Sequence, residues 1–143
     1  MKSIKFFSLC LFISVFHLTS AGAANNTFLK CQLIDTFSNR ILDEASALHQ
    51  NSQSKAQPIL FLLSYRSVTG LVKDSRQATA EDRKLEMKLS YHVSGAEGEA
   101  ASEVLYRTDA IESTLNPLAE TRLEEPQFQK ELRLVCNLGL VQN

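Results

Sequence analysis

Two histidines, His49 and His92, are the side chains best suited to acid–base chemistry outside an apolar N-terminal stretch. The apolar/polar alternation around His92 places it on the polar face of a strand, and His49 ends a segment that could form a helix. Both histidines are therefore expected at the surface. The chain has no Gly-x-Ser-x-Gly nucleophile motif. Catalytic triads are recognised by geometry rather than by residue order, so a hydrolase site assembled from distant residues remains an alternative. The sequence itself identifies no catalytic residue.

The local patterns that hold metals or phosphates are also missing from the sequence. It contains no His-x-x-x-His pair and no Cys-x-x-Cys pair. The acidic residues Glu120, Glu124 and Glu125 lack the glycine-punctuated spacing of a calcium loop. Gly95 and Gly98 are not followed by the Lys-Ser pair of a phosphate-binding loop. We therefore expect no metal and no cofactor.

Two cysteines, Cys31 and Cys136, lie near the two ends of the expected domain, and the third, Cys10, lies in the apolar N-terminal stretch. An even pair in an exported chain predicts a disulfide. Such a bond would close a loop of roughly 100 residues and contribute about 4 to 5 kcal/mol in the chain-entropy model. It would also require the first and last strands to approach within about 7 Å between Cα atoms.

The N-terminus has the three parts of an export signal. Lys2 and Lys5 precede an apolar stretch, Phe6–Leu18, which is too short to span a bilayer. The small residues that follow favour cleavage before Ala24 or before Asn25. These features predict a secreted or periplasmic protein.

Cleavage would divide the chain into a signal peptide over 1–23 and a single globular β-rich domain over 24–143. Loss of Lys2 and Lys5 leaves 13 basic against 16 acidic side chains, a net charge of −3, which argues against nucleic-acid binding. The apolar stretch belongs to the leader, so no membrane span is expected in the mature chain. One glycosylation sequon begins at Asn25, and its use depends on the host.

Apolar and polar residues alternate with a period of two in three segments, which predicts half-buried strands over 27–34, 84–94 and 132–140. Glu103–Thr108 is a shorter candidate strand. Ile59–Leu63 is continuously apolar and predicts a central strand covered on both faces.

Two further segments favour helix. Ile41–Leu48 places Ile41, Ala45 and Leu48 on one helical face, and Asp109–Leu115 begins with the spacing of a helix cap. The predicted fold is therefore mainly β: a small antiparallel β-sandwich or barrel with one or two short helices, its N- and C-terminal strands linked by the disulfide.

The functional expectation follows from a stapled β scaffold without a visible reactive group. We expect a small exported, non-enzymatic binding or accessory protein with an unknown protein or small-molecule partner. The candidate binding surface consists of two Tyr-Arg pairs, Tyr65-Arg66 and Tyr106-Arg107. The alternatives are a small secreted hydrolase with a dispersed site and a carrier of a small apolar ligand.

Overall fold

The computed structural model of the 143-residue chain describes residues 27–49, 57–77, 82–108, 117–125 and 130–140. These residues form eight β-strands, and no helix occurs among them. The strands are β1 (Thr27–Asp35), β2 (Arg40–Leu48), β3 (Ile59–Tyr65), β4 (Val68–Arg76), β5 (Asp82–Val93), β6 (Ala96–Arg107), β7 (Ala119–Glu125) and β8 (Lys130–Leu140). The expected leader and the sequon at Asn25 lie outside the described residues.

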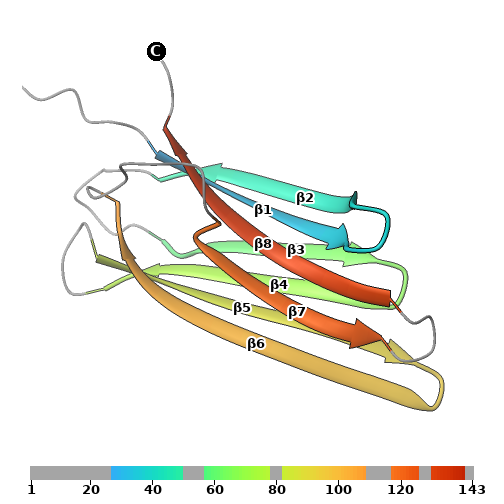
Figure 1. Ribbon diagram of the computed structural model, residues 1–143. Helices are drawn as coiled ribbons and strands as arrows, with labels where there is room; N and C mark the ends of the chain where they lie inside the picture. Colours follow the sequence, from blue (N-terminus) through green and yellow to red (C-terminus); the bar gives the residue numbers. More distant parts are fainter. Residues whose placement is uncertain (1–26, 50–56, 78–81, 109–116, 126–129, 141–143) are drawn as a thin grey trace, which may run out of the picture.

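The strands form two four-stranded antiparallel sheets that pack face to face (Figure 1). Sheet A has the order β2-β1-β8-β7, and sheet B has the order β3-β4-β5-β6. The β1–β2, β3–β4 and β5–β6 hairpins turn at the same end of the molecule. Of the two predicted architectures, an antiparallel β-sandwich or a barrel, the two-sheet arrangement confirms the sandwich.

The core between the sheets contains the inward side chains that the period-two alternation predicted, together with inward residues of β3 and β4. Seven of the largest are fully buried: Leu29, Leu33, Leu63, Leu85, Met87, Leu89 and Leu134. The three strongest strand predictions correspond to β1, β5 and β8. The candidate strand Glu103–Thr108 overlaps the end of the longer strand β6, which ends at Arg107.

The predicted disulfide joins the first strand to the last. Cys31 of β1 lies directly opposite Cys136 of β8, with 4.1 Å between the two Cα atoms and a sequence separation of 105. Both cysteines are fully buried. The bond therefore staples two neighbouring strands inside the core.

The helix expected over Ile41–Leu48 is wrong, because this segment is strand β2 and pairs with β1 in antiparallel register. Ala45 and Ala47 pack against the core, whereas Leu48 is exposed. The segment fits both the helical and the strand period, and pairing with β1 decides between them. The other expected helix, Asp109–Leu115, lies outside the described residues.

The central strand expected over Ile59–Leu63 is also wrong. This segment forms β3, which is an edge strand of sheet B and pairs only with β4 among the described strands. Phe61 and Leu63 point into the core, but Leu60 and Leu62 are exposed on the other face. This continuously apolar strand is therefore covered on one face and exposed on the other.

Two glycines allow an aromatic ring of the neighbouring strand to lie across the sheet. A Cβ at Gly98 would lie 2.4 Å from Cε1 of Tyr91, its partner in the β5–β6 register. A Cβ at Gly139 would lie 2.3 Å from Cζ of Phe28, its partner in the β1–β8 register. Each ring occupies the space that a side chain would fill.

Candidate functional site

A buried polar cluster joins the two sheets at the end where β1 begins and β2 ends. Its members are Thr27, His49, Asp74, Arg83 and Tyr106, which come from four strands and from the residue after β2. Thr27 is the first residue of β1, and His49 directly follows the last residue of β2. The other three face inward from β4, β5 and β6 of sheet B.

His49 connects the two halves of this cluster. Its Nδ1 lies 2.8 Å from the Thr27 hydroxyl, and its Nε2 lies 2.8 Å from Asp74 Oδ2. Arg83 Nε donates to both oxygens of Asp74, at 3.1 and 3.0 Å, and the Tyr106 hydroxyl donates to Oδ2 at 2.9 Å. Several donors therefore compensate the burial of the Asp74 carboxylate.

The Tyr106 hydroxyl responds to this environment. Burial raises the pKa of Tyr106 well above its usual range, and the negative charge of Asp74 raises it further. Tyr106 therefore remains a neutral hydrogen-bond donor, which suits its position beside a carboxylate.

The order Thr27–His49–Asp74 is that of a nucleophile, a base and an orienting acid. The relative exposure of these residues is only 2 %, 3 % and 0 %. A reacting carbonyl would need to approach within about 3 Å of the Thr27 oxygen, and the packing leaves it no approach. The cluster therefore links the two sheets as a buried polar clamp.

The expectation of a surface position is wrong for His49, which is buried, and right for His92. His92 lies on the outer face of sheet B, 3.7 Å from Glu97. The sequence carries a signal for this cluster in strands β4 and β5. Asp74 and Arg83 occupy inward positions of strands whose other inward residues are apolar, and such charges are expected to pair with each other.

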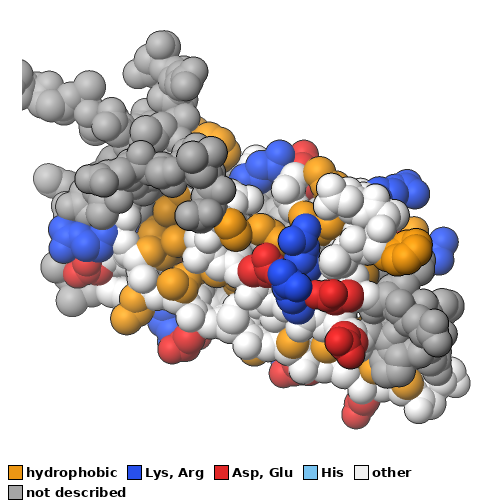
Figure 2. All heavy atoms as spheres, in the orientation of Figure 1, with side chains coloured by type: hydrophobic (Ala, Val, Ile, Leu, Met, Phe, Trp, Pro, Cys, Tyr) orange, Lys and Arg blue, Asp and Glu red, His pale blue; other side chains and the backbone are white. Residues whose placement is uncertain are grey.

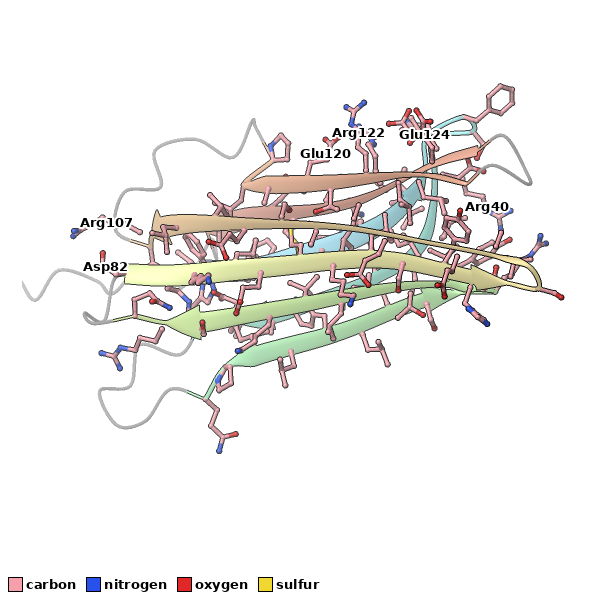
Figure 3. All side chains as sticks on the ribbon, turned by 90° about the horizontal axis from the view of Figure 1, so that it is seen from below. Arg40, Asp82, Arg107, Glu120, Arg122 and Glu124 are labelled. Carbon is pink, nitrogen blue, oxygen red and sulfur yellow. A yellow bond between two sulfur atoms is a disulfide. The ribbon has the colours of Figure 1, made fainter. Side chains whose placement is uncertain are left out.

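The structure places the two Tyr-Arg pairs at opposite ends of sheet B. Tyr65 ends β3 and Arg66 lies in the following turn, with the Arg66 guanidinium 5.2 Å from the centre of the Tyr65 ring. Tyr106 belongs to the buried polar cluster. Arg107 lies beside Asp82, at 3.7 Å, at the other end of the sheet (Figure 3). The four residues therefore do not form one continuous surface.

The outer face of sheet B carries an apolar surface that sequence reasoning missed. Leu60 and Leu62 of β3 and Leu71 of β4 point outward, with relative exposures of 62 %, 70 % and 45 %. Leu62 lies directly opposite Leu71 in the β3–β4 register, and Leu60 is two residues from Leu62 on the same face. We call these three residues the leucine strip.

The part of this face formed by β5 and β6 is mostly charged, and lysine and glutamate alternate along β5 at Lys84, Glu86 and Lys88. Three of the ion pairs on this face are Lys73–Glu86 at 3.5 Å, Lys84–Glu103 at 2.8 Å and Lys88–Glu99 at 2.6 Å. The hydrogen bond with Glu103 raises the pKa of Lys84, and Lys84 in turn lowers the pKa of Glu86. The face is thus apolar along β3 and charged along β5 and β6.

The outer face of sheet A differs from the leucine strip. Figure 2 shows acidic and basic side chains gathered over β7 and β8. Arg122 forms ion pairs there with Glu120 and with Glu131, the latter at 3.1 Å. Glu120, Arg122 and Glu124 all point away from sheet B (Figure 3).

Edge strands are commonly protected from association by charged side chains. Among the described residues, β3 is the one edge strand of the four that has no charged side chain. Charged residues of the other three edges include Arg40 and Glu44 on β2, Glu97, Glu99 and Glu103 on β6, and Glu120, Arg122 and Glu124 on β7. Leu60 and Leu62 of the leucine strip therefore lie on the edge strand that has no charged side chain of its own.

The described residues include four other large exposed hydrophobic side chains, Phe37, Ile41, Leu48 and Leu105. Ile41 and Leu48 lie on β2 of the other sheet, 48 % and 57 % exposed. Leu105 on β6 is 72 % exposed, but its partner in the β5–β6 register is Lys84. Phe37 is 90 % exposed in the turn between β1 and β2, where its backbone N–H donates to Asp35 Oδ1 at 3.0 Å. Single exposed hydrophobic residues are common on protein surfaces, whereas contiguous ones mark interaction sites.

Comparisons of the chain with known protein families, with curated proteins and with solved structures give no match. Within the described ranges, no helix is long and apolar enough to cross a membrane. The same residues contain no group of three or more His, Cys, Asp or Glu side chains arranged to hold a metal ion. The geometry of the chain itself is therefore the basis for a functional assignment.

Proposed function

We propose that this protein is a small exported, non-enzymatic binding protein that docks on another protein through the leucine strip. The observation that carries the proposal is the outward orientation of Leu60, Leu62 and Leu71 on regular, hydrogen-bonded strands. Strand pairing holds the backbone of these residues in place, so binding to this surface needs no ordering of the backbone.

The free energy gained by burying the three leucines indicates whether the strip alone can hold a partner. Full burial of an exposed leucine contributes about 1.5 to 3 kcal/mol, so covering the remaining exposed part of the strip gives roughly 3 to 5 kcal/mol. Association costs about 4 to 15 kcal/mol in lost freedom of motion. The strip must therefore be the centre of an interface that also includes its polar border.

That border defines the chemistry of the partner. Lys73 and Glu86 lie beside the strip toward one end of the sheet, and Lys88 and Glu99 lie beside it further along. A fitting partner is a protein surface that is apolar at its centre and carries both acidic and basic side chains around it.

Export is part of the proposal. It is supported by the predicted leader and by the buried Cys31–Cys136 disulfide, since such bonds persist in oxidising compartments. The two alternative functions have less support. The interior is filled by leucine and methionine side chains, which leaves little room for an apolar ligand, and the threonine of the buried polar cluster is inaccessible.

Site-specific photo-crosslinking in the native host tests the proposal. A benzophenone amino acid replaces Leu62, and a matched variant carries it at the equally exposed Leu105. We expect a discrete protein adduct from position 62 that is absent from position 105 and is lost when Leu60→Glu is added. Equal adducts from both positions, or none from position 62, would refute docking through the strip.

A further inference from the structure

We infer that the partner of the leucine strip is a second copy of this chain, bound about a two-fold axis. The inference rests on the proposed function and names its partner. In a two-fold contact the same surface serves both sides, so every feature of the surface must be compatible with its own copy.

The first requirement is an uncharged centre, because a residue near the axis meets the same residue of the other copy. The leucine strip satisfies it, since Leu62 would meet Leu62 and its apolar neighbours. An equivalent contact centred on β6 would bring Glu97, Glu99 and Glu103 close to the same residues of the second copy. Like charges placed against each other are destabilising, so the outer face at β3 is favoured over the outer face at β6.

The second requirement is a border that complements itself. Lys73 lies next to Glu86, and Lys88 lies next to Glu99, so acidic and basic groups alternate along the same side of the strip. Rotation about a two-fold axis can therefore place a lysine of one copy against a glutamate of the other. A border of one sign would prevent such pairing.

The contact uses the outward side chains rather than the strand edge itself. The Ser64 backbone N–H, which points away from β4, already donates to Asp43 Oδ2 of β2 at 2.8 Å. Asp43 thereby occupies part of the edge along which a new strand would have to pair. Association through the face leaves this hydrogen bond intact and buries all three leucines.

Sedimentation equilibrium of the full mature protein, from micromolar to near-millimolar concentration, tests the inference. We expect a reversible monomer–dimer equilibrium, which Leu62→Glu weakens by about tenfold or more while Leu105→Glu leaves it unchanged. Circular dichroism of both variants shows whether the fold is retained. A Leu62→Cys variant provides a second readout, because oxidation should link two copies, whereas Leu105→Cys should not.

A wild-type protein that remains monomeric throughout, or a dimer that is insensitive to Leu62→Glu in a folded variant, would overturn the inference. These results are distinguishable from failure of the proposed function. If the protein is monomeric but position 62 still crosslinks to a different protein, the proposed docking surface stands and the second copy is ruled out as its partner. A monomer without any position-62 adduct removes both.

Discussion

Leu62 and Leu71 face each other across the β3–β4 register, and both side chains point away from the core, 70 % and 45 % exposed. A cross-strand leucine pair normally stabilises a sheet by lying under a second layer. Here that pair lies on the outer face, and Leu60 extends it along β3. This relationship distinguishes β3 and β4 from the charged strands β5 and β6 of the same sheet.

The disulfide is expected to contribute strongly to stability. Replacing Cys31 and Cys136 together with alanine should lower the free energy of unfolding by about 3 to 5 kcal/mol, because the bond closes a loop of 105 residues. Urea unfolding followed by circular dichroism measures the change. A loss below about 1 kcal/mol would show that the unfolded chain gains little freedom when the bond is removed.

The buried polar cluster should be far more sensitive to substitution than an exposed ion pair. Asp74→Asn leaves Arg83 buried without its carboxylate and should cost about 3 to 5 kcal/mol. Asp82→Asn removes the exposed partner of Arg107 and is the matched control, with an expected cost of at most about 1 kcal/mol. Similar losses in both variants, measured by thermal or urea unfolding, would contradict the role of the cluster as a clamp.

Tyr106 should give the stability a dependence on alkaline pH. Its pKa is raised in the folded state, so its contribution is fully present below the unfolded pKa of about 10 and is lost as the pH rises above that value. The difference in unfolding free energy between the wild type and Tyr106→Phe should therefore shrink above about pH 10. If the two pH profiles stay parallel through this range, the hydroxyl is not held in the neutral form by folding.

Gly98 should not tolerate a side chain. Gly98→Ala places a Cβ 2.4 Å from the Tyr91 ring and should cost about 1 to 3 kcal/mol through overpacking. Adding Tyr91→Leu should reduce that cost in a double-mutant cycle. Gly95→Ala is the control: it has no atom within 4 Å but a φ of +83°, so the same Tyr91 change should not rescue it. Equal rescue of both glycine variants would rule out contact with the ring as the cause.

The regular strands and the disulfide could be predicted because they depend on local pattern. Alternation in β1 and β8 placed Cys31 and Cys136 on inward faces before their pairing was known. Strand β2 could not be predicted in this way, because its spacing fits a helix as well, and only pairing with β1 determines the conformation.

The site was harder to predict because it depends on which elements become neighbours. An apolar run such as Ile59–Leu63 shows that both faces are apolar, but not whether either face is covered. The burial of His49 likewise depends on Asp74 of the opposite sheet, 25 residues away in sequence. The sequence therefore shows which residue types are present in the leucine strip and the buried polar cluster. It does not show that the first set is exposed and the second buried.

The most direct test of the docking surface is hydroxyl-radical footprinting read by mass spectrometry. It compares side-chain oxidation in the exported fraction of the native host with oxidation in dilute purified protein. The account predicts that Leu60, Leu62 and Leu71 are protected in the exported fraction while Leu105 is oxidised equally in both samples. Equal oxidation of all four leucines in the two samples would show that nothing covers the strip and would contradict the account.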